Sequence, residues 1–270
     1  MKDWFMTLIK GLFVGSTMLV PGVSGGSMAM ILGIYDRLIT AVSSFRKDTK
    51  KHILFLLLFS LGGLMGMVLF ANPILTAIAL WTRPMLYFFI GIVLGGVPLI
   101  LKKANVHRFH FNVIFLPFLG VLTVFLLTKL QSFNFQQDQQ SLVQILWLII
   151  AGFVSAIALV LPGISVSYML LLLGMYDTTM HAISECYLPF LIPLGIGLML
   201  GIISTTKLLE MLMKRYTQAT YLVIFGFVIG SVFEILPGLP LKGEWILCMF
   251  SLCAGILLIS ILLRFDKEEC

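Results

Sequence analysis

The chain has 270 residues, of which 60% are hydrophobic and only 11% are charged, and its mean hydropathy is +1.07. Soluble domains carry about a quarter charged residues, so this composition excludes an ordinary soluble protein and indicates one that spans a membrane. The formal net charge of +6 does not indicate nucleic-acid binding. The basic residues lie in short loops between apolar runs, where they set the orientation of a membrane protein.

The first predicted feature is a broken apolar region over residues 4–40, interrupted by the run Leu19-Val-Pro-Gly-Val-Ser-Gly-Gly-Ser-Met28. Such a break exposes backbone polar groups that hydrocarbon cannot satisfy. The first arm is nearly long enough to span the bilayer as a helix. The second arm, near 26–39, reaches only about 20 Å, short of a hydrocarbon core of roughly 30 Å. We therefore predict a re-entrant hairpin, with two thin, tilted spans as the alternative.

Six long apolar runs and a second broken region complete the chain. A second Pro-Gly break, Leu159-Val-Leu-Pro-Gly-Ile-Ser-Val-Ser-Tyr-Met169, interrupts residues 142–180, and its second arm near 167–179 is equally short. Each of the six runs has the roughly 17–25 residues that a transmembrane helix needs. They cover residues 53–71, 85–101, 110–128, 188–206, 219–236 and 244–263.

The two broken regions are copies of one another. A shift of 141 residues superimposes Gly11–Asp36 on Gly152–Asp177 with nine of 26 positions identical. Each half then contains one hairpin and three crossings. Because three is odd, the second half starts on the opposite face of the membrane. The predicted fold is therefore an all-α integral membrane protein with an inverted-topology repeat. Residues 1–135 and 136–270 form its two halves within one membrane domain.

The distribution of basic residues predicts the orientation. With each hairpin entering and leaving on one side, 15 of the 18 Lys and Arg residues lie on the side of the N-terminus. The other side holds only Arg83, Lys129 and Lys242. Since cytoplasmic loops are enriched in Lys and Arg, we expect both termini to be cytoplasmic.

The two breaks form the candidate site for a ligand. In transporters, broken helices at matching places in two repeats hold the substrate, and free N–H groups at a helix start favour an anion. The alternative is that Pro-Gly only makes a tight hairpin and that small residues allow close packing. The predicted substrate-binding residues around the breaks are Pro21, Gly22, Ser24, Gly25, Gly26, Ser27, Pro162, Gly163, Ser165 and Ser167.

Three charged residues are further candidates. Arg37, at the end of the first hairpin, and Arg83, on the sparsely basic side, could each guide an anion. Glu234, near the end of a predicted crossing, could carry a coupled proton or simply lie among lipid headgroups. The four Cys and four His residues have no metal-ligand spacing, so no metal, cofactor or catalytic residue is predicted.

The motifs resemble a known family. Pro21-Gly-Val-Ser-Gly-Gly-Ser-Met28 followed by Leu-Gly-Ile-Tyr-Asp-Arg-Leu38, with the second Pro-Gly-Ile-Ser copy and Leu-Gly-Met-Tyr-Asp177, resembles the bacterial polyprenyl-phosphate transporters of the PopT type. The resemblance covers essentially the whole chain. It implies a multi-pass protein of the bacterial plasma membrane that returns undecaprenyl phosphate from the outer to the inner leaflet. The implied partners are this lipid and the bilayer, and the oligomeric state stays open.

Two other functions are alternatives to polyprenyl-phosphate transport: transport of a small soluble anion and hydrolysis of a lipid phosphate. A secondary transporter for a small soluble anion would have a sealed pocket between the breaks. A membrane lipid phosphatase is less favoured, because phosphoester cleavage needs concentrated positive charge around the transferring group. Gly25 and Val166 stand where the similar pyrophosphatases carry an Arg after the motif Ser. The chain is therefore expected not to be an enzyme.

Overall fold

The computed structural model describes residues 2–20, 22–45, 48–106, 110–129, 142–241 and 243–267, and within them all regular secondary structure is helical. The first half of the chain forms six helices: α1 (Lys2–Thr17), α2 (Gly25–Ile31), α3 (Tyr35–Ser43), α4 (Thr49–Leu80), α5 (Thr82–Ala104) and α6 (Phe111–Lys129). The second half forms another six: α7 (Leu142–Val160), α8 (Val166–Leu172), α9 (Tyr176–Ser184), α10 (Leu188–Arg215), α11 (Thr217–Ile235) and α12 (Trp245–Lys267).

Seven of the described helices are long and apolar enough to cross a membrane, which makes this an all-α, multi-pass membrane protein. Six of them, α4, α5, α6, α10, α11 and α12, are the six predicted apolar runs. The seventh is α7, the first arm of the second broken region. The longest, α4, has 32 residues and continues through Pro73, well beyond the predicted 53–71. Side chains exposed on α4 and α12 are largely apolar, as expected for surfaces that face lipid.

Each second arm consists of two short helices rather than one. The arm near 26–39 is two short helices, α2 and α3, and the arm near 167–179 is α8 and α9. Gly33 and Gly174 end the first helix of each pair with φ angles of 71° and 67°. The helix ends at Gly33 and Gly174 are both Schellman motifs, because the glycine and the residue after it donate matching backbone hydrogen bonds to the preceding helix. Glycine adopts this left-handed conformation without steric cost.

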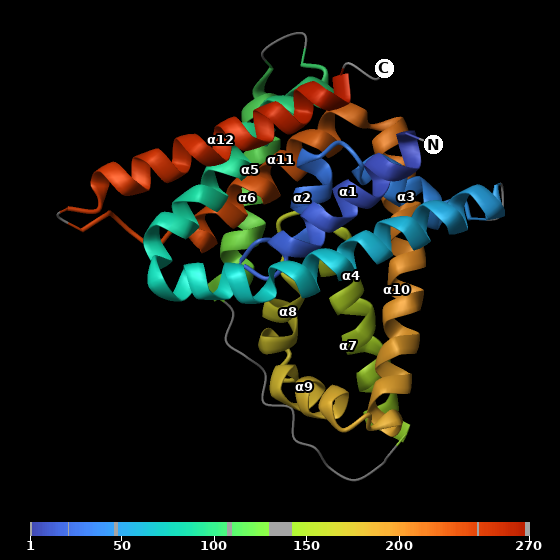
Figure 1. Ribbon diagram of the computed structural model, residues 1–270. Helices are drawn as coiled ribbons and strands as arrows, with labels where there is room; N and C mark the ends of the chain where they lie inside the picture. Colours follow the sequence, from blue (N-terminus) through green and yellow to red (C-terminus); the bar gives the residue numbers. More distant parts are fainter. Residues whose placement is uncertain are drawn as a thin grey trace.

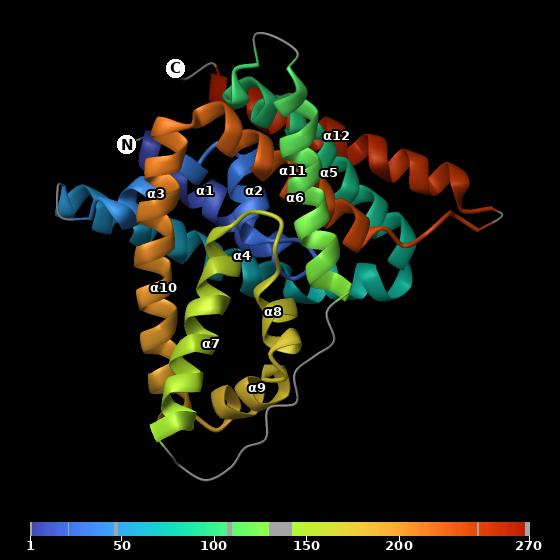
Figure 2. The ribbon, with the colours of Figure 1, turned by 180° about the vertical axis from the view of Figure 1, so that it is seen from behind.

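The long helices pair in the same way in both halves (Figures 1 and 2). α1 packs along α4, and α7 packs along α10. The remaining long helices pair between the two halves: α5 packs along α12, and α11 packs along α6. Helix α5 also contacts α11 at the centre of the molecule. Glycines at these crossings, such as Gly62 between α4 and α1 and Gly197 between α10 and α7, leave no room for a side chain. Small residues of this kind let membrane helices approach closely.

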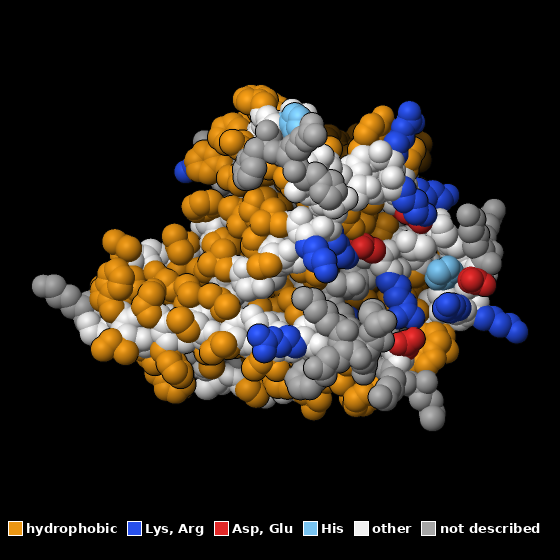
Figure 3. All heavy atoms as spheres, turned by 90° about the horizontal axis from the view of Figure 1, so that it is seen from above, with side chains coloured by type: hydrophobic (Ala, Val, Ile, Leu, Met, Phe, Trp, Pro, Cys, Tyr) orange, Lys and Arg blue, Asp and Glu red, His pale blue; other side chains and the backbone are white. Residues whose placement is uncertain are grey.

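One end of the molecule carries the basic residues. Both chain termini lie at this end in Figure 1. The last turns of α5 and α10 contribute Lys102, Lys103, Lys214 and Arg215. Figure 3 looks down on this end and shows blue basic side chains gathered near its centre and on one side, with apolar side chains around them. Basic side chains at one end of a membrane protein can bind anionic lipid headgroups.

Candidate functional site

The two Pro-Gly-Ser loops meet inside the molecule. The Oγ of Ser24, in the first loop, accepts a hydrogen bond of 2.9 Å from the backbone N–H of Gly163, in the second. A Cβ atom on Gly26 would lie 3.2 Å from the Cα of Pro162, so the loop backbones are in contact. Residues 139 positions apart in sequence are thereby joined. Pro21, the proline of the first break, lies outside the described residues.

The Ser24 hydroxyl joins the two loops and uses both of its lone pairs and its proton in doing so. Its side chain caps α2 by accepting from the N–H of Ser27 at 3.0 Å, and it also accepts from Gly163. Its Oγ lies 2.9 Å from the Oγ of Ser27. A hydroxyl has one proton and two lone pairs, so the proton remains for Ser27. Ser24 is 8% exposed and Ser27 is 1% exposed. Both therefore fix the loop geometry.

The serines of the second loop are more open. Ser165 caps α8, but its bond from the N–H of Tyr168 is long, at 3.4 Å. Ser165 is half-buried and Ser167 is exposed. The first N–H groups of any helix have no acceptor within the helix, and in α8 these belong to Val166 and Ser167. The second loop thus leaves the hydroxyl of Ser167 exposed and that of Ser165 half-buried, whereas the first loop uses the hydroxyls of Ser24 and Ser27 internally.

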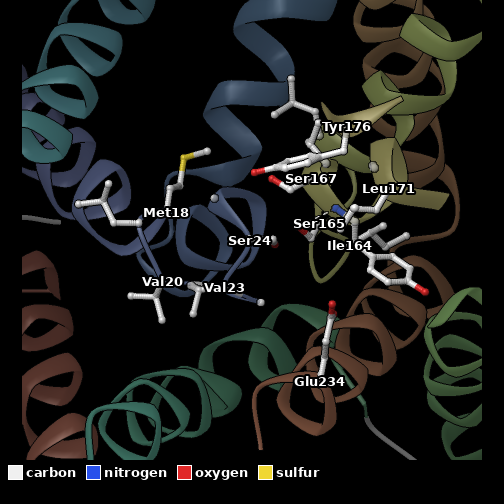
Figure 4. A pocket seen from close by; sticks show the side chains of 17 residues that line it. Met18, Val20, Val23, Ser24, Ile164, Ser165, Ser167, Leu171, Tyr176 and Glu234 are labelled. Atoms are coloured by element: carbon white, nitrogen blue, oxygen red, sulfur yellow. Dashed lines mark hydrogen bonds between the residues drawn. The ribbon is translucent and has the colours of Figure 1, made fainter. Parts of the chain in front are cut away.

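A cavity of about 420 Å³ lies between the two loops. Figure 4 shows the hydroxyls of Ser167 and Tyr176 turned toward its middle and the carboxyl group of Glu234 pointing in from the opposite side. Its described lining comes from the first loop, the second loop with α7 and α8, and the ends of α9 and α11. Five predicted site residues of the loops line it: Gly22, Ser24, Gly25, Ser165 and Ser167. Predicted residues Gly26, Ser27, Pro162 and Gly163 lie behind them and shape the loops.

The cavity has a polar wall and an apolar rim. Glu234, from the last turn of α11, is the one charged side chain among the described lining residues. Lining residues Met18, Leu159 and Leu171 are also 42%, 38% and 48% exposed on the molecular surface. The cavity is therefore bordered by apolar side chains that reach the surface of the molecule. An amphipathic ligand could place its polar end inside and its apolar part outside.

The two candidate arginines lie away from this cavity. The guanidinium of Arg37 stacks over the ring of Phe55 at 4.3 Å and lines a separate pocket of about 320 Å³ with Lys51 and His52. Arg83 forms an ion pair with Glu244 at 3.3 Å near the start of α5. The described cavity lining therefore holds hydroxyl groups, backbone and one carboxyl group, without a basic side chain.

Sequence reasoning did not assign two tyrosines to the site. Tyr176, the first residue of α9, lines the cavity. Its counterpart in the first copy, Tyr35, is 3% exposed and donates a 2.7 Å hydrogen bond to the backbone carbonyl of Val160, just before the second loop. Both tyrosines are among the nine identical positions of the repeat. That identity was the signal that could have found them.

This arrangement suits binding better than bond cleavage. Among the described residues, no group of three or more His, Cys, Asp or Glu side chains could hold a metal ion. An enzyme that transfers phosphoryl groups places positive charge around the reacting phosphate. The described part of the cavity supplies none. The fold and site define a multi-pass membrane protein with a cavity between two broken-helix loops, lined by hydroxyls, backbone, apolar side chains and one carboxyl group.

Comparison with known proteins identifies the family. Residues 14–242 match the undecaprenyl phosphate translocase-like family, and the chain belongs to it. It is 31% identical to a polyprenyl-phosphate transporter of Staphylococcus aureus over 98% of both chains. It is 29% identical to a polyprenyl-phosphate transporter of Vibrio cholerae, over 87% of this chain and 78% of that protein. No solved structure gives a significant match. The protein is therefore a transporter and not an enzyme, as the sequence predicted.

Proposed function

We propose that this protein carries undecaprenyl phosphate, or a closely related polyprenyl phosphate, from the outer to the inner leaflet of the bacterial plasma membrane. The names of both relatives support the substrate class. The observation that carries the proposal is the cavity between the two loops, with hydroxyls on its wall and exposed apolar side chains at its rim. A phosphate cannot cross hydrocarbon unaided, because burying an unpaired charge is prohibitive. The isoprenoid tail, in contrast, can stay in lipid.

The phosphate head would be held by neutral donors. The exposed hydroxyl of Ser167, the hydroxyl of Ser165 and the first amide groups of α8 and of Gly25 face the cavity or border it. Hydrogen bonds to a charged group contribute about 1.5–3 kcal/mol each, so several together can replace a cation. Ser24, Ser27, Gly26 and the Pro162-Gly163 pair would act by positioning these donors. Arg37 and Arg83 would act only outside the cavity, on the approach or departure of the lipid.

Glu234 gives the cavity a second role. A phosphate in the same low-dielectric space as the Glu234 carboxylate would be strongly repelled. Repulsion is relieved when the carboxyl group is protonated, so a proton would enter with the lipid and leave after it. Glu234 would thereby couple transport to the proton gradient. The described lining contains no other carboxyl group that could do this.

Alternating access by two inverted repeats would move the lipid. The matched helix pairs of the two halves, and the loops that meet from each half, support this arrangement. Each half would contribute one re-entrant hairpin, α1–α3 or α7–α9, and one bundle would rock against the other around the central site. The basic end that holds Lys103 and Lys214 would face the cytoplasm, together with both termini.

A leaflet assay on reconstituted liposomes tests the proposal. Labelled undecaprenyl phosphate is placed in one leaflet and its appearance in the other is followed, with and without excess inorganic phosphate. We expect protein-dependent transfer that inorganic phosphate does not compete away. Competition at millimolar phosphate would instead favour a transporter of small soluble anions.

A double variant locates the head within the cavity. Ser165→Ala with Ser167→Ala should slow transfer by about tenfold or more, since two donors to a charged group are lost. The matched control is Ser204→Ala, an exposed serine on α10 that bonds only its own helix, to the carbonyl of Leu200. Unchanged transfer in the double variant would show that the phosphate binds elsewhere.

A further inference from the structure

The two hairpins pack differently, although the long helices of the two halves pair alike. Helix α3 of the first half packs along α10 of the second half, and α2 contacts α7. The corresponding contacts in the second half would join α9 to α4 and α8 to α1. Among the described helices, α9 instead packs against α8 and α10 of its own half. Figure 2 shows α3 beside the upper part of α10, near the N-terminus, while α9 lies at the opposite end of the molecule.

A polar cluster fastens α3 to α10. The hydroxyls of Ser43 and Ser44 donate to Oε2 of Glu210, at 2.5 and 3.3 Å. Lys214, one turn further along α10, holds Oε1 of the same carboxylate at 2.5 Å. The Glu210 side chain is only 13% exposed. Hydrogen bonds to charged groups are the stronger class, so this cluster stabilises the packing of α3 on the other half.

A second cluster fastens the start of α3. The carboxylate of Asp36 accepts a 2.9 Å hydrogen bond from the hydroxyl of Tyr221 on α11 and pairs with Lys103 of α5 at 2.5 Å. Tyr221 belongs to the second half and Lys103 to the first. Both ends of α3 are thus tied across the boundary between the halves.

Among the described residues, the second hairpin shows no equivalent ties. By the 141-residue shift, Ser43 and Ser44 correspond to Ser184 and Glu185. By the 135-residue shift that aligns Gly66 with Gly201 later in the repeat, Glu210 corresponds to Leu75 of α4. Ser184 and Glu185 both interact with His181 of their own helix. Leu75 is exposed rather than covered by α9. The polar residues that close one side are therefore missing from the other side.

We infer that Glu210 is a gate residue whose contacts with Ser43 and Ser44 close access to the cavity at the α3 end, and that the structure is the state open at the α9 end. This inference rests on the proposed alternating-access function. With the basic end in the cytoplasm, the closed gate is cytoplasmic and the cavity accepts lipid from the outer leaflet. In the opposite state Glu210 releases α3, and α9 packs against α4 around Leu75.

Reversible crosslinking tests the gate. In a background with the native cysteines replaced, Ser43→Cys with Glu210→Cys is bridged by a short bis-methanethiosulfonate reagent, and transfer of labelled undecaprenyl phosphate is measured. We expect loss of transfer on bridging and recovery after reduction. The matched control bridges Glu210→Cys to Lys214→Cys within one helix and should transfer at the same rate before and after bridging. Full transfer with the Ser43–Glu210 bridge intact would overturn the inference.

A second measurement does not depend on transport. A cysteine at Ser167 is labelled with a membrane-impermeant thiol reagent from either side of right-side-out and inverted vesicles. With Glu210 intact we expect labelling from the outer side. Glu210→Leu, which copies the residue at the equivalent position of α4, should reduce outer labelling and raise inner labelling severalfold. Identical labelling in both proteins contradicts the gate even if the lipid assignment is right. A shift in labelling without any lipid transfer would instead refute only the proposed substrate.

Discussion

Replacing Ser24 by alanine should destabilise the protein far more than replacing its sequence counterpart Ser165. The Ser24 side chain accepts from the N–H groups of Ser27 and Gly163 in a nearly buried position. Ser24→Ala leaves both donors without their acceptor, and a buried unsatisfied group costs about 1–3 kcal/mol. The expected loss in unfolding free energy is therefore about 2–4 kcal/mol. Ser165 makes one long bond to Tyr168 in a half-buried position, so Ser165→Ala should cost about 0.5–1 kcal/mol.

Thermal unfolding in detergent or nanodiscs, followed by intrinsic tryptophan fluorescence, measures this difference. For a chain of this size, 1 kcal/mol corresponds to roughly 2–4 °C in Tm. Ser24→Ala should therefore lower the Tm by on the order of 10 °C and Ser165→Ala by about 2 °C. Ser204→Ala provides the baseline for losing an exposed hydroxyl. Equal shifts for Ser24 and Ser165 would refute the reasoning, because they would mean that Ser24 does not join the two loops.

Three further predictions follow from individual contacts. Gly163→Ala should prevent stable folding, because Gly163 has a φ of 85° and an added Cβ would clash with the backbone of α11. The control is Gly195→Ala, which has open space around it and should leave the Tm unchanged or slightly higher. Tyr35→Phe removes the buried bond to the Val160 carbonyl and should lower the unfolding free energy by about 1–3 kcal/mol in chemical denaturation. Arg83→Ala should change both the Tm and lipid transfer little, since exposed ion pairs contribute about 0–1 kcal/mol; a tenfold loss of transfer would return Arg83 to the site.

Much of the fold follows from local features of the sequence. The length and hydropathy of the six apolar runs predicted six of the long helices in the structure, namely α4, α5, α6, α10, α11 and α12. The Ser24 and Ser165 N-caps lie just after the Pro-Gly breaks, where a short polar side chain is favoured. The Leu-Gly pairs at Gly33 and Gly174 carried the signal for the Schellman motifs. The prediction of a second arm in each broken region did not divide it at these glycines.

The contacts between distant segments could not be predicted in the same way. The bond from Gly163 to Ser24 and the attachment of α3 to Glu210 depend on how the halves pack. The repeat suggests that the two loops are equivalent, yet Ser24 accepts a hydrogen bond from Gly163 of the other loop, whereas its counterpart Ser165 accepts one long bond from Tyr168 of its own loop. Arg37 was a plausible phosphate ligand by motif. Its side chain instead stacks on Phe55, because a guanidinium near an aromatic face gains a cation–π contact.

An experimental structure in nanodiscs with a short-chain polyprenyl phosphate bound tests the central claim most directly. The account predicts that the phosphate group lies between the two loops, within hydrogen-bonding distance of Ser165, Ser167 or the first amides of α2 and α8, with the tail leaving past Met18 or Leu171. A phosphate found instead in the separate pocket of Arg37 and Lys51, with the cavity between the loops empty, would contradict it.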